Sequence, residues 1–175
     1  MADTPRIERL EVFVGGLTRP ELKSRLRSRG VLLNVHAETL LKEAIFDKRD
    51  ARVVVVTERT VAELGLSDGA TLPQIFAVAQ DRGLQLCPAD TGPYLRMVLT
   101  EQAASSNSVL SSGKPPAEAL TVAAAPPSED DDYPKGFYLR VVDDQAWLRG
   151  YRCDDQHIWH PDDRFVFAAA PAVFT

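Results

Sequence analysis

Alternating and continuous apolar runs predict most of the strands in the sequence. Residues 10–14 read Leu-Glu-Val-Phe-Val, and residues 52–57 hold four consecutive valines, a composition typical of a strand buried on both faces. Two further runs, at residues 137–142 and 146–152, are separated by a pair of aspartates and predict a β-hairpin. A last run at residues 164–167 predicts the final strand.

Several segments between these strands have the apolar periodicity of helices. Thr18 opens a capping-box signature with a proline in the first turn, and two leucines four positions apart give this helix one apolar face. A second apolar stripe predicts a helix over residues 35–46, so residues 18–46 predict a helical hairpin. Thr71 repeats the capping signature and opens a predicted helix over residues 72–82.

The middle of the chain is less regular. Residues 89–93 predict a short helical turn, and residues 94–100 predict a strand. Serine, proline and acidic residues then dominate residues 101–135, a composition typical of a flexible insertion, although residues 120–124 are apolar enough to pair as a strand. The contiguous acids at residues 129–132 favour a solvated loop over a calcium site, because they lack the alternate spacing and the glycine of an EF-hand loop.

Together these elements predict a single α+β domain. An antiparallel or mixed sheet packs against the helical hairpin of residues 18–46 and the helix of residues 72–82, and residues 136–168 form a β-rich tail. A chain of 175 residues, 45% of them hydrophobic, is long enough to bury one sizeable core without a metal or a disulfide.

The cysteines and the apolar runs predict a cytoplasmic location. Cys87 and Cys153 lie in no C-x-x-C pattern, which is typical of reduced thiols inside the cell, and Cys87 sits in an apolar run that predicts a core position. No apolar run approaches the roughly 20 residues that cross a bilayer, so we expect no membrane contact. The first six residues also lack a basic-then-apolar signal segment.

The charge distribution disfavours nucleic acid as a partner. Residues 1–60 carry 12 Lys and Arg against 9 Asp and Glu, whereas residues 61–175 carry 8 against 16. Phosphate contacts need cationic groups that displace counterions, so only the N-terminal part is electrostatically suited to them. The helices predicted there resemble a helix-turn-helix in outline, but the second holds a single cation, Lys42, where a recognition helix offers several phosphate-contacting groups.

Several stretches are similar to a known family. They are Gly-Val-Leu-Leu-Asn at residues 30–34 and the segments 64–72, 83–88, 94–96, 136–140, 147–151 and 161–167. On these residues the chain resembles a family of small, mostly uncharacterised bacterial proteins whose members are sometimes labelled helicases. The resemblance implies no established activity, and the sequence has no G-x-x-x-x-G-K-[ST] phosphate loop to support the helicase label.

Few residues are spaced for catalysis or metal binding. The sequence holds no G-x-S-x-G elbow and no G-x-G-x-x-G loop. His157 and His160 have an H-x-x-H spacing with flanking aspartates, which is compatible with a metal site or with a polar turn, and we expect the polar turn. We therefore predict no metal and no cofactor.

The β-rich tail holds the candidate binding surface. Because alternate residues of a strand share a face, one face of the predicted hairpin carries aromatic rings beside two guanidinium groups. Its residues, joined by His157 from the following loop, are Tyr138, Arg140, Trp147, Arg149 and Tyr151.

Such a mixture suits recognition of an anion, a nucleotide or a peptide, because arginine both stacks on rings and forms bidentate hydrogen bonds. The same residues also fit a purely structural role. We predict a non-enzymatic binding or interaction module for a small anionic ligand or a protein partner. The alternative is a small enzyme with Arg140 and Arg149 as anion clamps and His157, Asp162 or Asp163 as acid–base groups.

Overall fold

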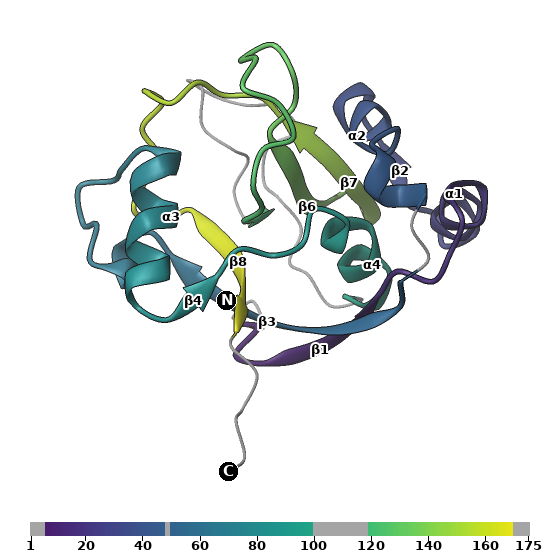
Figure 1. Cartoon of the computed structure of the whole chain (residues 1–175), viewed down its shortest axis with the longest axis horizontal. Coiled ribbons are helices and arrows are strands. Elements are labelled where there is room, and N and C mark those ends of the chain that lie inside the picture. The colour runs from purple at the N-terminus through teal and green to yellow at the C-terminus, as the bar shows by residue number, and fades with distance from the viewer. Residues whose placement is uncertain (1–5, 48–49, 100–118, 170–175) are drawn as a thin grey trace.

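The computed structural model describes residues 6–47, 50–99 and 119–169. Within these ranges the chain forms helices and strands in an α+β arrangement, as the sequence predicts (Figure 1). The strands are β1 (Leu10–Val14), β2 (Leu32–Leu33), β3 (Arg52–Thr60), β4 (Leu84–Gln85), β5 (Leu120–Val122), β6 (Gly136–Val142), β7 (Gln145–Tyr151) and β8 (Arg164–Ala169). The helices are α1 (Arg19–Ser28), α2 (Val35–Leu40), α3 (Leu72–Asp81) and α4 (Thr91–Val98), with 3₁₀ turns η1 (Ala44–Asp47) and η2 (Ala62–Leu64).

The sheet is mixed and curls around α4. Its strand order is β1-β3-β8-β5-β6-β7-β2, with β4 paired to β8 off this path. The pairs β5–β8 and β2–β7 are parallel, and the others are antiparallel. Helix α4 contacts β1 near one end of the sheet and β6 and β7 near the other, so the sheet wraps around it (Figure 1).

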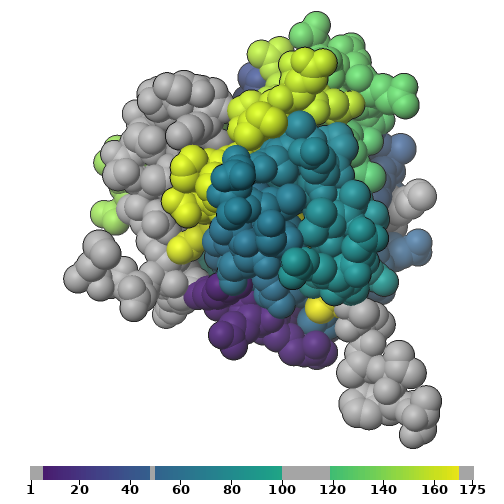
Figure 2. Space-filling view, turned by 90° about the vertical axis from the view of Figure 1, so that its left-hand side faces the viewer, coloured from purple at the N-terminus to yellow at the C-terminus, as the bar shows by residue number. Residues whose placement is uncertain are grey.

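Two apolar cores lie on opposite faces of this sheet. On β8, Val166 and Ala168 face the core inside the curl, whereas Phe165 and Phe167 face the second core. This alternation is the period-two pattern of a strand buried on both sides. The second core is covered by α3 and its neighbouring segments, which form the centre of the face seen in Figure 2.

The predicted helical hairpin is not confirmed. Helix α1 begins at the predicted cap, with the hydroxyl of Thr18 accepting from the backbone N–H of Glu21 and the carboxylate of Glu21 accepting from the N–H of Thr18. Strand β2 separates α1 from α2, and α1 contacts α4 while α2 contacts β7. Helix α2 also ends at Leu40, so the predicted span of 35–46 is wrong beyond that residue.

The strand predicted over residues 94–100 is wrong for its described part. Residues 91–98 form α4, which is buried from Thr91 to Arg96. A short helix buried on most sides has little polar face, so its apolar run resembles that of a buried strand. The prediction failed because the sheet encloses this helix.

Two further predictions need correction. Strand β3 is present, but Val53 is 48% exposed, so its N-terminal half is not buried on both faces. The flexible insertion predicted over 101–135 falls partly on residues 101–118, which lie outside the described residues. Residues 119–124 are buried, and β5 lies between β8 and β6 in the sheet.

Among the described residues, no helix has the length and apolar character needed to cross a bilayer.

Candidate functional site

The register of the β6–β7 hairpin confirms the predicted strand faces. Tyr138 lies opposite Arg149, Arg140 opposite Trp147, and Gly136 opposite Tyr151. Cross-strand neighbours share a face, so the five predicted side chains lie on the outer face of the curled sheet. Asp143 and Asp144 both have positive φ angles, the conformation of a type I′ hairpin turn.

Burial divides this face into two parts. Tyr138 and Tyr151 belong to the second core, where the Tyr151 ring meets Trp159 edge to face at 5.5 Å. Arg140 is fully buried, and its pKa is lowered first by burial and second by the positive charge of Arg149. Three of the five hairpin residues of the predicted binding surface are therefore buried.

Trp147 and Arg149 are the half-buried part of the predicted face. The guanidinium carbon of Arg149 lies 4.1 Å from the centroid of the Trp147 ring, which is cation–π geometry. Arg149 forms no ion pair with any acidic residue in the described ranges. Of the five predicted residues on this face, Trp147 and Arg149 are therefore the two that a ligand could reach.

The described contacts of His157 and His160 do not include Arg140 or Arg149. His157 packs edge to face on Trp159 at 5.4 Å, and Nδ1 of His160 accepts from the backbone N–H of Asp162. Within residues 6–47, 50–99 and 119–169, no group of three or more His, Cys, Asp and Glu side chains is arranged to hold a metal ion.

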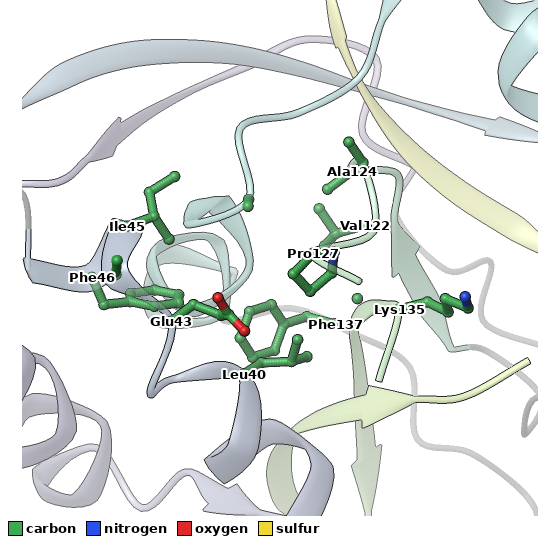
Figure 3. Close-up of a pocket in the computed structure, with 13 residues that line it drawn as sticks. Leu40, Glu43, Ile45, Phe46, Val122, Ala124, Pro127, Lys135 and Phe137 are labelled. Atoms are coloured by element: carbon green, nitrogen blue, oxygen red, sulfur yellow. The ribbon is translucent and has the colours of Figure 1, made fainter. Parts of the chain in front are cut away.

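A cavity that the sequence did not predict lies inside the curl of the sheet. Its volume is about 250 Å³, and we call it the Phe137 cavity. Its lining residues come from three separate stretches of chain and from Ala89 (Figure 3). They are residues 40 and 43–46, residues 122, 124, 125 and 127, and residues 135–137. The lining is apolar apart from Glu43 and Lys135, and exposed alanines and a proline line its outer part.

Asn34 fixes the helix that carries one wall of this cavity. Its Oδ1 accepts from the N–H of Ala37 at 2.8 Å and from the N–H of Gly150 at 2.9 Å, while its Nδ2 donates to the carbonyl of Gly150 at 3.1 Å. A Cβ on Gly150 would lie 2.7 Å from the backbone carbon of His36. The N-cap residue of α2 therefore also attaches this helix to β7. The two elements can lie this close because residue 150 of β7 is a glycine and has no Cβ.

Arg19 holds the segment after α2 in place. Its Nη2 donates to the carbonyls of Lys42 and Glu43 at 3.2 and 3.3 Å and to the carboxylate of Asp47 at 2.8 Å. One guanidinium thus bridges the turn between α2 and η1, and this contact sets the backbone position of Glu43.

Phe137 forms the inner wall from β6. It is 4% exposed, and its ring meets that of Phe46 edge to face at 6.2 Å. A Cβ on Gly92 in α4 would lie 2.8 Å from three carbons of Phe137, so α4 backs this ring closely. The Phe137 side chain therefore packs directly against the backbone of α4.

Glu43 is the polar feature of the cavity. Its Oε1 accepts a hydrogen bond from the hydroxyl of Tyr133, and this bond, together with burial, raises the pKa of Tyr133 to about 12. Figure 3 shows the Glu43 carboxylate on the side of the cavity near Phe137, whereas the Lys135 side chain extends away from it. The Lys135 ammonium lies 3.5 Å from Asp131.

A second cavity, of about 550 Å³, lies near the C-terminal end of α4 and has a more polar lining. Its lining mixes Arg29, Arg96 and Asp144 with apolar side chains. Arg96 donates to the carbonyls of Leu99, Arg140 and Trp147, so its guanidinium joins α4 to the hairpin. Burial lowers the pKa of Arg96 to about 10, and the group remains a cation at neutral pH.

The Phe137 cavity has no compact signal in the sequence. Its lining is spread over four separate parts of the chain, and most of the lining residues are ordinary apolar residues. The single local hint is Glu43, a charged residue next to the apolar residues of the predicted second helix.

Comparison with known proteins finds no match for this chain. The sequence matches no protein-family model, no curated protein and no solved structure. The resemblance to a family of small bacterial proteins therefore stays a prediction.

Proposed function

We propose that the chain is a non-enzymatic binding module that holds a small ligand with an apolar body in the Phe137 cavity. The observation that carries the proposal is the cavity itself, a concave apolar space with one carboxylate in its lining. Ligand sites in proteins commonly join an apolar lining to a few placed polar groups. An apolar cavity of roughly 150 Å³ already admits benzene, so a space of about 250 Å³ has room for a substituted ring.

The walls of the cavity are rigid, which favours binding. Asn34 attaches α2 to β7, Arg19 holds the turn at Glu43, and Gly92 lets α4 back the ring of Phe137. A preformed site loses little conformational entropy when a ligand enters, so even a small ligand can bind measurably.

Isothermal titration calorimetry with a panel of ring-bearing fragments tests this proposal. Ala125 is exposed and lines the cavity, so Ala125→Trp should fill its outer part. Ala62 is an exposed alanine of η2 outside the lining, so Ala62→Trp is the matched control. We expect binding to the wild type and to Ala62→Trp, and at least a tenfold loss in Ala125→Trp. Equal binding to all three proteins, or no binding of any fragment to the wild type, overturns the proposal.

A second candidate function is supported by Arg149. A half-buried guanidinium that is stacked on Trp147, lies near a second buried arginine and has no acidic partner in the described ranges favours an anion. The small anionic ligand predicted from the sequence would bind here. Neither cavity is lined by Arg140, Arg149 or His157, so we do not propose an enzyme.

Inorganic phosphate and sulfate test this second candidate in a thermal-shift assay. We expect both to raise the Tm of the wild type and of Arg27→Ala, which removes an exposed arginine of α1 that has no ion pair with a described residue. Arg149→Ala should abolish the shift. A shift that survives Arg149→Ala excludes Arg149 from the site.

A further inference from the structure

The charges around the Phe137 cavity are unbalanced. Among the described residues that line it, Glu43 is the one carboxylate and Lys135 the one cation. The stem of Lys135 contributes to the wall, but its ammonium extends away from the space and pairs with Asp131 (Figure 3). A ligand in the cavity therefore meets the negative charge of Glu43, and no described lining residue turns a cation toward it.

The hydrogen bonds of Glu43 leave one carboxylate oxygen available. Oε1 accepts from Tyr133, whereas Oε2 accepts from no residue in the described parts of the chain. The guanidinium of Arg19 contacts this turn, but its described hydrogen bonds are to the carbonyls of Lys42 and Glu43 and to Asp47. A half-buried carboxylate without a cationic partner gains most from a donor that is itself charged.

The outer part of the cavity adds to this negative field. Pro127 lines the cavity, and the exposed residues Glu129, Asp130, Asp131 and Asp132 follow within five positions of it. Exposed carboxylates attract cations over about a Debye length and are screened by salt. Their effect is therefore on approach to the cavity, while Glu43 acts on the bound ligand.

The apolar walls are suited to a ring. Phe46 and Phe137 present two aromatic surfaces held edge to face, with Leu40 and Val122 beside them. Aromatic rings prefer offset or edge-to-face neighbours, and their faces also attract cations.

We infer that the ligand of the Phe137 cavity is a small amine that joins an apolar ring to a protonated nitrogen, with the ring against Phe46 and Phe137 and the ammonium on the free oxygen of Glu43. The inference rests on the proposed function, because it names the class of ligand for the same cavity. No atom of Glu43 reacts, so the interaction is an ion pair with a hydrogen bond.

Three probes of the same shape test the inference by calorimetry on the full chain. They are phenethylamine, phenethyl alcohol and phenylacetate, measured at pH 7.5 in low and moderate salt. We expect the amine to bind the wild type about tenfold or more tightly than the alcohol, since a charge-assisted hydrogen bond is about twice as strong as a neutral one. Phenylacetate should bind most weakly. Added salt should weaken the binding of the amine and should not weaken the binding of the other two probes.

Two variants locate the selectivity. Glu43→Gln keeps the shape of the side chain and should bring the amine to the affinity of the alcohol. Tyr133→Phe removes the hydroxyl from Oε1 and leaves the carboxylate, so it should retain the preference for the amine or strengthen it. Loss of the preference in Tyr133→Phe to the same extent as in Glu43→Gln overturns the inference, because the selectivity would then depend on the hydroxyl.

The wild-type data alone distinguish failure of the amine inference from failure of the proposed function, so this distinction does not depend on whether the variants fold. Equal affinity for the amine and the alcohol, or tighter binding of phenylacetate, overturns the amine inference and leaves the cavity as a binding site. Absence of binding by all three probes contradicts the proposed function itself.

Discussion

Replacing Asn34 by alanine tests how the fold positions the cavity wall. Strand β2 pairs with β7 only at Trp147 and Leu148, and the side chain of Asn34 continues this pairing at Gly150. Asn34→Ala removes the cap of α2 and both hydrogen bonds to the backbone of Gly150, which is buried.

The expected cost follows from these three bonds. Loss of an N-cap costs about 1 kcal/mol, and a buried N–H or C=O left without a partner costs about 1–3 kcal/mol. Asn34 itself is only half-buried, so water can reach part of the vacated site. We therefore expect Asn34→Ala to lower the free energy of unfolding by about 2–4 kcal/mol.

Urea unfolding followed by tryptophan fluorescence measures this loss. Thr71→Ala is the matched control, because the Thr71 hydroxyl caps α3 by accepting from the N–H of Gln74 and has no cross-strand bond described. It should cost about 1 kcal/mol. Asn34→Asp keeps an acceptor for the cap but faces the carbonyl of Gly150 with a second oxygen, so it should also destabilise the fold. A cost of Asn34→Ala no larger than that of Thr71→Ala would refute this reasoning, as would an Asn34→Asp variant as stable as the wild type.

Three further predictions concern the cavity wall and the buried ionisable groups. Gly92→Ala should destabilise the protein by about 1–3 kcal/mol in urea unfolding and weaken fragment binding, because the new Cβ would lie 2.8 Å from Phe137 and displace this cavity-lining side chain. Burial raises the pKa of Cys87 to about 12 and that of the half-buried Cys153 to about 11. At pH 8, Ellman's reagent should therefore label Cys153 slowly, at a rate still rising above pH 9, and should label Cys87 only on unfolding; rapid labelling of Cys87 in the folded protein would contradict its burial. Burial also raises the pKa of Glu58, so its contribution to stability is greatest below the unfolded pKa of about 4.3 and falls as pH rises through the folded value. The stability of Glu58→Gln relative to wild type, measured in urea, should therefore improve from pH 4 to pH 7, and a relative loss over that range would show that the ion pair with Arg164 outweighs desolvation.

Features with a local cause were predicted well from the sequence. Thr18 and Thr71 open helices because a hydroxyl and a residue three positions later exchange hydrogen bonds, and both capping boxes are present. The β6–β7 hairpin follows from two alternating runs and a tight turn, and its strand faces agree with the register. These signals require no knowledge of the rest of the chain.

Features that depend on distant segments were missed. Residues 89–100 predict a turn followed by a strand, whereas residues 91–98 form α4, which is buried from Thr91 to Arg96. The burial of Arg140 and Tyr151 could not be predicted from alternation, which gives the face of a strand but not what covers it. The Phe137 cavity exists only where residues 40–46, 122–127 and 135–137 meet, and no spacing along the chain encodes that meeting.

A methyl-resolved NMR titration of the wild type with phenethylamine tests the central claim most directly. The account predicts saturable shifts of the methyl groups of Leu40, Ile45 and Val122, which line the cavity, and no shift at Ile75, which is buried in the second core. Unchanged methyl signals at the three cavity residues up to millimolar amine, or shifts that cluster at Ile75, would contradict the assignment of the Phe137 cavity as the binding site.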